Sequence, residues 1–489
     1  MLPVTPNELD RRMRFDNPWW EAEATAVNAD AELPKRRFFT HFHDLVRQRE
    51  VNRAVVLMGP RRVGKTVMLS QSIDALIADG MPAADLVYMS LDTPLYSGWS
   101  LEALLQRFHA LQGHHRHSHL TVCFDEIQYL QNWEIHLKSL VDSYPSHRFV
   151  ASGSAAAALR LKSRESGAGR FTEFLLPPLT FVEYLEFIGE HSLLATKLDW
   201  PIRGKSWQGH ELDTLNRHFI DYINIGGYPE AVFSEHIRKD RARYIKSDII
   251  EKVLLRDLPS LYGVNDIPAL NRLFNVLAYN SGQEISLEQL SKQSVTPKNT
   301  LKRYLEYMEA AFLIKTLHRI DQNAKRFKRA TQFKIYLTNP SLRAALFGPI
   351  DANDAAMGPM VETALLGQLL LDGSVDHTYY ARWPKGEIDF VQIAANNLTP
   401  NLAIEVKWSD RPKTDQRLTK HLCKFMDTHT DLKQVYITSI GASGTINTAS
   451  GDIQLIPAAD LALALGQIGL IAKTAGLLEK IYLMMPKPD

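Results

Sequence analysis

The segment from Gly59 to Thr66, Gly-Pro-Arg-Arg-Val-Gly-Lys-Thr, matches the pattern G-x-x-x-x-G-K-[S/T]. It follows an apolar run at 54–58 that predicts a strand, and a stretch with helical apolar spacing follows it. Glycines let successive backbone N–H groups surround a phosphate, and the N-terminus of the following helix adds positive potential. The pattern therefore predicts a nucleotide-phosphate loop on an α/β sheet, with these members: Gly59, Pro60, Arg61, Arg62, Val63, Gly64, Lys65, Thr66 and Val67.

An acidic pair, Asp125-Glu126, ends the apolar run at 120–124. Carboxylates directly after a buried strand need a partner, because burying an unpaired charge costs free energy. Beside a phosphate loop, we expect Asp125 and the Thr66 hydroxyl to hold Mg²⁺. We expect Lys65 to contact the β- and γ-phosphates of ATP and Glu126 to polarise the attacking water. The two motifs together predict ATP hydrolysis.

The wider pattern around these motifs indicates a parallel sheet. Short apolar runs at 54–58, 86–91, 120–124 and 149–151 alternate with helical patterns, which is typical of strands connected by helices. Lys and Arg number 56 against 55 Asp and Glu, so a polyanion would have to bind to a local patch. Cys123 and Cys423 lie too far apart for a disulfide framework and fit a reducing compartment, so we expect a cytoplasmic protein. The most apolar stretch, 461–478, is interrupted by Gly466, Gln467 and Lys473, so we expect no membrane segment.

The chain resembles AAA-type ATPases that carry a DUF4143 region after the ATPase domain. The resemblance covers nearly the whole chain. It rests on Asn17–Trp20, Gly59–Thr66, Asp125–Gln128, Ala151–Ser154, Gly169-Arg170, Leu176–Glu183, Gly226–Glu230 and Arg256–Leu258.

The resemblance implies two further parts of the ATP site. One is a polar sensor of the γ-phosphate, here Ser152 or Ser154. The other is an arginine that a neighbouring subunit supplies, for which Arg170 is the first candidate and Arg160 and Arg164 are rivals. An arginine that acts on a neighbour requires a homo-oligomer, and the resemblance implies a hexameric ring.

Residues 286–338 are typical of a winged helix, in which two short helices precede two strands. Ser286 and Gln289 form a capping box at the start of the first helix. Thr296-Pro297 starts a second helix with Leu301 and Leu305 on its apolar face. The second helix of such a unit normally enters the major groove of DNA.

This region also concentrates positive charge, with ten Lys and Arg against three acidic residues from 298 to 334. We therefore expect contacts with the DNA backbone, which carry little sequence information. The alternative is that the unit only packs between domains. The candidate DNA-binding residues are Lys298, Lys302, Arg303, Lys325, Arg326, Lys328 and Arg329.

Near the C-terminus, carboxylates and a lysine are expected on neighbouring strands. Asp389 lies in a strand pattern at 386–393, and Glu405 and Lys407 share one face of a second at 402–407. If the strands pair, Asp389 lies opposite Glu405, and Glu362 begins a helix upstream. Carboxylates in this arrangement, Asp389 and Glu405, can bind Mg²⁺ for phosphodiester hydrolysis, and a lysine beside them stabilises charge. The four residues resemble the core of PD-(D/E)xK nucleases; the alternatives are a binding module without turnover and surface ion pairs.

We expect an N-terminal arm (1–35), an AAA+ P-loop domain (36–180), a helical lid (181–262), a winged-helix-like domain (263–345) and a restriction-endonuclease-like α/β domain (355–489). The function expected is an ATP-hydrolysing enzyme that remodels or translocates DNA, branched or single-stranded, with a Mg²⁺-dependent nuclease-like domain. Two alternatives stay open. One is a branch-migration type of remodeller whose nuclease-like domain only binds DNA, and the other is an ATP-dependent switch that recruits a partner.

Overall fold

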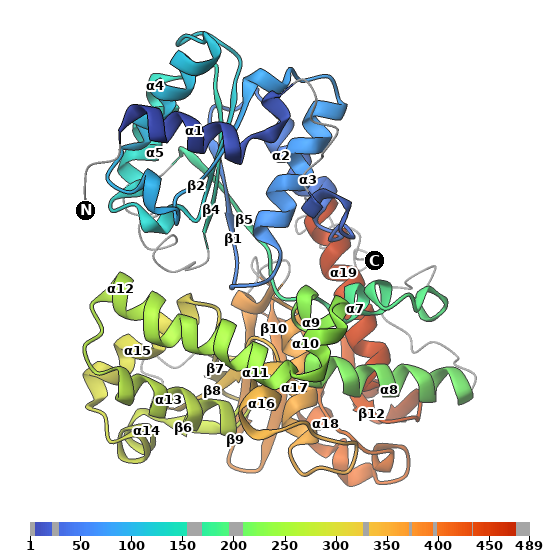
Figure 1. The fold of residues 1–489 in the computed structure, drawn as a ribbon. Helices are drawn as coiled ribbons and strands as arrows, with labels where there is room; N and C mark the ends of the chain where they lie inside the picture. Colours follow the sequence, from blue (N-terminus) through green and yellow to red (C-terminus); the bar gives the residue numbers. More distant parts are fainter. Residues whose placement is uncertain are drawn as a thin grey trace. The chain divides into compact units, whose positions relative to one another are not determined.

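The fold is described from a computed structural model and comprises two compact units, 1–176 and 177–489, each considered by itself (Figure 1). The structure describes residues 5–21, 29–153, 169–194, 209–325, 332–370, 374–394, 399–432 and 434–475. Among these residues no helix has both the length and the apolar character that crossing a membrane requires.

The N-terminal unit contains the parallel α/β sheet that the sequence predicts. Its five strands are ordered β2-β3-β4-β1-β5, and every neighbouring pair is parallel. The strands are β1 (Ala54–Met58), β2 (Leu86–Ser90), β3 (Thr121–Asp125), β4 (Arg148–Gly153) and β5 (Phe171–Leu175). The fifth strand is not among the strands predicted from apolar runs. It begins Phe-Thr-Glu and is only partly buried, as expected for a strand at the edge of the sheet.

Helices cover both faces of this sheet, which is why β1, β3 and β4 consist of buried residues throughout. Figure 1 shows α4 and α5 on one side of the sheet and α2 and α3 on the other. The helices are α1 (Pro6–Asp16), α2 (Phe39–Arg47), α3 (Lys65–Ala78), α4 (Leu101–Gln112) and α5 (Trp133–Ser143).

The N-terminal arm covers the free edge of β2. The Asn17 side chain donates to Tyr88 O at 2.9 Å and accepts from Tyr88 N at 2.6 Å, and Trp20 Nε1 donates to Leu86 O at 2.8 Å. These bonds satisfy backbone groups that an edge strand would otherwise expose. The tryptophan therefore packs and caps the sheet.

The first part of the C-terminal unit is helical. Its helices are α7 (Phe181–Phe187), α8 (Gly209–Ile225), α9 (Pro229–Phe233), α10 (Glu235–Lys239), α11 (Arg241–Tyr244), two π-helical turns (Ile245–Glu251 and Val253–Asp257) and α12 (Leu258–Tyr262). The next segment contains α13 (Ile267–Tyr279), β6 (Glu284–Ser286), α14 (Leu287–Ser294), α15 (Lys298–Ala310), β7 (Ile314–Ile320) and β8 (Gln332–Leu337).

The remaining chain completes a nine-stranded sheet in the order β13-β14-β12-β11-β10-β9-β7-β8-β6. Strands from the predicted winged-helix and nuclease-like segments thus belong to one sheet, joined where β7 and β9 pair in parallel through Arg319↔Tyr380 and Ile320↔Ala381. The added strands are β9 (Thr378–Trp383), β10 (Gly386–Ile393), β11 (Pro400–Glu405), β12 (Gln434–Ser439), β13 (Gly444–Thr448) and β14 (Gly451–Pro457). The added helices are α16 (Ser341–Phe347), α17 (Met357–Gln368), α18 (Lys420–Thr428) and α19 (Ala458–Ala475).

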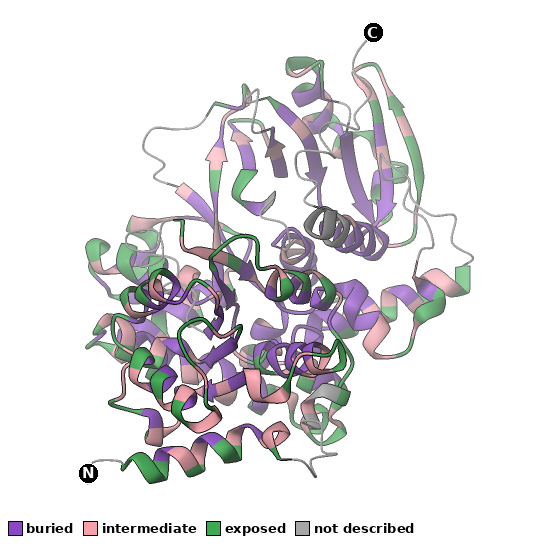
Figure 2. Ribbon diagram, turned by 90° about the horizontal axis from the view of Figure 1, so that it is seen from above, coloured by how far each residue is buried: buried purple, intermediate pink, exposed green. Residues whose placement is uncertain are grey.

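The core of this unit lies between the sheet and its helices. Buried residues follow the strands, and exposed residues lie on outward-facing helix surfaces (Figure 2). Residues 458–465 at the start of α19 are buried, and α19 contacts α17. The apolar C-terminal run therefore includes a helix that covers the core.

Candidate functional site

The phosphate loop connects β1 to α3 and is held in a shape that needs glycine. A Cβ at Gly59 would lie 2.2 Å from Leu176 O, so a side chain there would collide with the backbone that follows β5. Gly64 adopts φ +94° immediately before α3 begins, a conformation that side chains disfavour. The Arg36 guanidinium donates to Val63 O at 2.8 Å and supports the loop from outside.

Lys65 lies at the first turn of α3, and its side chain curls back over the loop. Its Nζ donates to Gly59 O at 3.1 Å and to Pro60 O at 2.8 Å, and the residue is 5% exposed. An ammonium group in this position lies inside the ring of loop backbone that would surround a phosphate. The loop, the helix N-terminus and the lysine thus fit the anion that the motif predicts.

Asp125, at the end of β3, joins the loop to the rest of the site. Thr66 Oγ1 and the Tyr88 hydroxyl each donate to its Oδ2 at 2.8 Å. Its Oδ1 accepts from the Ser152 hydroxyl and, at 3.0 Å, from Glu126 N. The structure thus brings together the predicted residues Thr66, Asp125 and Ser152, from two strands and the first turn of α3, and their oxygens are the hard ligands that Mg²⁺ prefers.

Tyr88 is a member of this cluster that the sequence reasoning missed. It lies on β2, and burial together with the charge of Asp125 raises the pKa of its hydroxyl, which keeps it a donor to Asp125. The strand at 86–91 was predicted, but only the pairing of β2 with β3 reveals that Tyr88 lies beside Asp125.

Glu126 has a backbone conformation that turns the chain sharply after β3. Its φ is +52°, which is uncommon for a residue with a side chain, and Gln128 Nε2 donates to its carboxylate. A strained backbone held by local hydrogen bonds is typical of residues that must project into a site.

The candidate trans arginine lies away from the phosphate loop of its own chain. Arg170 immediately precedes β5, and its O accepts from Ala54 N at 2.9 Å, at the start of β1. The loop follows the other end of β1, so Arg170 lies at the opposite end of these strands. Its side chain forms an ion pair with Asp142, and both side chains are partly exposed. The two rival arginines, Arg160 and Arg164, lie outside the described residues, and so does Ser154, the alternative to Ser152 as the sensor.

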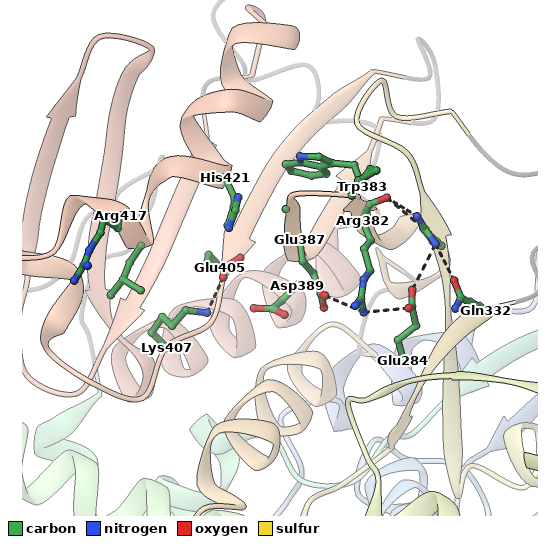
Figure 3. Close-up of a pocket in the computed structure, with 14 residues that line it drawn as sticks. Glu284, Gln332, Arg382, Trp383, Glu387, Asp389, Glu405, Lys407, Arg417 and His421 are labelled. Carbon is green, nitrogen blue, oxygen red and sulfur yellow. Dashed lines mark hydrogen bonds and ion pairs between the residues drawn. The ribbon is translucent and has the colours of Figure 1, made fainter. Parts of the chain in front are cut away.

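A second candidate site lies in the C-terminal unit, where a cavity of about 760 Å³ opens beside the nine-stranded sheet (Figure 3). Its walls combine acidic, basic and aromatic side chains. They include Glu284, Arg319, Gln332, Arg382, Trp383, Glu387, Asp389, Glu405, Lys407, Arg417 and His421.

The structure brings the four residues of the predicted nuclease-like site together. β10 and β11 pair in antiparallel fashion, with Phe390 opposite Ile404, which places Asp389 and Glu405 next to each other. Lys407 Nζ contacts Glu405 Oε1 at 2.6 Å, and Asp389 Oδ2 accepts from Val406 N at 2.9 Å.

Lys334 connects Glu362 to this cluster and is the residue that the sequence reasoning missed here. It lies on β8 and is 3% exposed. Its Nζ lies 2.7 Å from Glu387 Oε1, 3.1 Å from Asp389 Oδ1 and 3.6 Å from Glu362 Oε2. The available signal was a lysine within the apolar run Phe-Lys-Ile-Tyr-Leu, because a lysine in a strand buried on both faces requires carboxylate partners.

The three central carboxylates have different proton affinities. Burial, followed by the charge of Asp389, raises the pKa of Glu362 and that of Glu405 above the ordinary value of a glutamate. Burial alone would raise the pKa of Asp389 as well, but Lys334 and Lys407 outweigh it and hold this pKa below its ordinary value. Asp389 is therefore the carboxylate that stays ionised.

Within the described part of the chain, no group of three or more His, Cys, Asp and Glu side chains is arranged to hold a metal ion. The histidine-rich stretch 113–119 is a loop, in which His114 Nε2 lies 2.8 Å from Ala84 O. The basic residues of the winged-helix-like segment are exposed where described, at Lys298, Lys302, Arg303 and Lys325; Arg326, Lys328 and Arg329 lie outside the described residues.

Comparison with known proteins adds two family matches. The AAA domain family (AAA_14) matches residues 51–185, and a domain family of unknown function, DUF8612, matches 216–353. The second match is DUF8612, where the sequence motifs had suggested DUF4143. Together with the parallel sheet and the phosphate loop, the first match defines this part of the chain as a P-loop ATPase domain of the AAA type.

The chain is also similar to uncharacterized proteins of two organisms. It is 27% identical to one from Haemophilus influenzae over 73% of this chain and 84% of that protein. It is 22% identical to MJ1544 of Methanocaldococcus jannaschii over 83% of this chain and 87% of that protein.

Two solved structures overlap parts of the fold. PCH-2 of C. elegans has a TM-score of 0.28 and 15% identity, over 40% of this chain and 58% of that one. The replication initiator DnaA bound to AMPPCP and single-stranded DNA has a TM-score of 0.27 and 14% identity, over 55% of this chain and 86% of that one.

Proposed function

We propose that this chain is an ATP-hydrolysing AAA+ enzyme that binds DNA and remodels or translocates it. The observation that carries the ATPase part is the convergence of Thr66, Ser152 and Tyr88 on Asp125 beside the phosphate loop. Lys65 binds the β- and γ-phosphates, Thr66 and Asp125 hold Mg²⁺, and Glu126 orients and polarises the attacking water. Bound Mg²⁺ neutralises the charge that develops on the phosphates.

We further propose that the enzyme acts as a homo-oligomer, specifically a hexameric ring. Arg170 lies at the opposite end of β1 from the phosphate loop, so it is suited to act on a neighbouring subunit. Ser152, buried between Asp125 and Glu126 N, serves as the sensor that reports the γ-phosphate to this network. A cytoplasmic location belongs to this proposal, and it is supported by the two free cysteines.

DNA binding is proposed for the winged-helix-like segment. The order α13-β6-α14-α15-β7-β8, with β6, β8 and β7 antiparallel, supports this interpretation. Lys302 and Arg303 are exposed on α15, the helix that follows the short helix α14, and they would contact phosphates.

For the nuclease-like site we favour DNA binding without turnover. Mg²⁺ held by Asp389 and Glu405 is the chemistry that the resemblance implies, but the residues present do not fit it. Both oxygens of Asp389 already accept, from Lys334 and from Val406 N, and Glu405 Oε1 accepts from Lys407. Protein cations thus occupy the carboxylates that would bind the metal.

The experiment that tests the proposed function measures ATP turnover with and without single-stranded, duplex and branched DNA, and follows DNA length in the same samples. Stimulated turnover with intact DNA, abolished in Lys65→Ala, is expected. The matched control is Lys138→Ala on α5, away from the phosphate loop. ATP turnover that no nucleic acid changes would contradict DNA remodelling and would favour the ATP-dependent switch.

A further inference from the structure

We infer that Lys334 takes the place of a divalent cation in the carboxylate–lysine site, so that this site binds a DNA phosphate without a metal ion and does not cleave it. The inference rests on the DNA-binding part of the proposed function for its ligand, whereas the exclusion of the metal stands on the geometry alone.

The first argument is the position of the ammonium group. Glu387 and Asp389 of β10 and Glu362 of α17 all approach Lys334 Nζ, at 2.7, 3.1 and 3.6 Å. An ammonium group has three N–H donors, so three carboxylates can share it. A divalent ion held by Asp389 and Glu405 could use Asp389 Oδ1 only by displacing this ammonium group.

The second argument is the state of the oxygens. Mg²⁺ needs six oxygen ligands in near-octahedral geometry. Besides the bonds to Lys334, Glu362 Oε2 accepts from the Tyr336 hydroxyl at 2.8 Å, and Glu405 Oε1 accepts from Lys407 at 2.6 Å. Glu405 Oε2 is buried without a hydrogen-bond partner, so an ion at this site could add a second carboxylate oxygen only if Lys334 or Lys407 released one.

The third argument is that Lys334 cannot move away easily. Its backbone lies between two strands of the sheet, opposite Glu284 of β6 and Leu317 of β7. Its ammonium group also lies over the ring of Tyr380, 5.6 Å from the centroid. If the ammonium group moved away from the carboxylates, unpaired charges would remain in this buried position, which costs free energy.

Two further cations, Lys407 and Arg382, are partly exposed in the wall of the cavity (Figure 3). Lys407 Nζ contacts Glu405, and Arg382 Nη1 lies 3.0 Å from Glu284 Oε2 and 3.2 Å from Glu387 Oε2. An ammonium group has three N–H donors and a guanidinium group five, so further donors can pair with the oxygens of a phosphodiester. The site therefore keeps the phosphate-binding part of nuclease chemistry and lacks the ion that would generate hydroxide.

The test measures Mn²⁺ binding to the full chain by electron paramagnetic resonance, without nucleotide, in an Asp125→Asn background that removes the phosphate-loop ion site. This background is expected to show no Mn²⁺ binding that Asp389→Asn abolishes. Adding Lys334→Met, which keeps the length and removes the charge, is expected to create one Mn²⁺ site that binds at least tenfold more tightly than any residual Mn²⁺ binding of the background. That new site should disappear again in Lys334→Met/Asp389→Asn.

Asp389-dependent Mn²⁺ binding with Lys334 present would overturn the inference, and this comparison does not depend on how well Lys334→Met folds. A folded Lys334→Met protein that gains no Mn²⁺ site would also overturn it. So would DNA shortening with Mg²⁺ or Mn²⁺ that wild type shows and Asp389→Asn lacks.

The ligand is tested by photocrosslinking single-stranded DNA to wild type and Lys407→Gln. A severalfold loss of crosslinks to peptides of β10 and β11 is expected, and unchanged crosslinking would overturn the phosphate part. Failure of DNA to stimulate ATP turnover would instead contradict the proposed function.

Discussion

Thr66 Oγ1 donates to Asp125 Oδ2 at 2.8 Å, although 59 positions separate the two residues in the sequence. At this distance both oxygens can ligate one ion, because the ligands of an octahedral Mg²⁺ lie about 3 Å from one another. The parallel pairing of β3 with β4 and β2 positions Asp125, and the phosphate loop positions Thr66. The ATP site is therefore assembled by the sheet.

Tyr88→Phe tests a residue that donates a hydrogen bond to the Asp125 carboxylate. The hydroxyl donates to Asp125 at 2.8 Å, and outer hydrogen bonds to a metal-binding carboxylate contribute about 10–100-fold to affinity or activity. We expect ATP turnover at limiting Mg²⁺ to fall about tenfold and to recover partly at high Mg²⁺. The measurement is phosphate release across a Mg²⁺ titration.

Tyr96→Phe is the matched control, since its hydroxyl also donates to a partly buried aspartate, Asp16, at 2.7 Å but away from the phosphate loop. An equal loss of turnover in both variants would mean that Tyr88 acts only through stability.

Arg170→Ala tests the proposed contact between subunits. We expect turnover to fall by about 10³-fold, in the range for arginine fingers. Mixing Arg170→Ala with Lys65→Ala should restore part of the activity, because an intact phosphate loop then meets an intact arginine of a neighbour. Turnover of the two variants, alone and mixed, is the measurement. Wild-type turnover of Arg170→Ala would refute the assignment, and absence of rescue would refute action in trans.

Two histidines of the N-terminal unit predict a loss of stability in acid. His109 Nε2 and His147 Nε2 lie 3.0 Å apart, and burial lowers the pKa of His147 to about 4. An unfolded histidine has a pKa of about 6.5, so between pH 4 and 6.5 the unfolded chain binds a proton that the folded chain does not. The stability that neutral, buried His147 contributes is therefore fully present above pH 6.5 and is lost as the pH drops towards 4.

His147→Gln should flatten this dependence. We expect a smaller drop in the thermal unfolding midpoint between pH 7.5 and pH 5 than in wild type, measured by circular dichroism. The comparison variant is His191→Gln, in a short 3-10 turn at 191–193 where the residue is exposed. An unchanged slope in His147→Gln would show that the imidazole pair does not control acid stability.

The exposed cations of α15 predict salt-dependent DNA binding. Each duplex phosphate neutralised contributes about −0.9 to the slope of log affinity against log salt. Removing Lys302 and Arg303 together should reduce the slope by about 2, measured by fluorescence anisotropy between 50 and 200 mM salt. Lys239→Ala, exposed on α10, is the control expected to keep the wild-type slope. An unchanged slope in the double variant would mean that DNA phosphates do not contact Lys302 and Arg303.

Local patterns predicted most of the ATP site, because the loop and the residue at the end of β3 are each defined by a short stretch of sequence. Tyr88 has no such local pattern, and the local pattern around Lys334 is ambiguous. Lys334 lies between Phe333 and Ile335, an alternation that resembles a strand with one face in water, and its partners Glu362 and Asp389 follow 28 and 55 positions later. The register between distant strands decides whether such a lysine meets water or carboxylates.

The pairing of β7 with β9 has a practical consequence for dividing the chain. A cut between 345 and 355 would separate these strands and leave each fragment with an open strand edge at Arg319 and Ile320 or at Tyr380 and Ala381. Open edges recruit other strands, so both fragments should self-associate. A piece that starts at 177 and keeps the whole sheet should unfold in a single transition, whereas the shorter pieces should aggregate before they can be assayed.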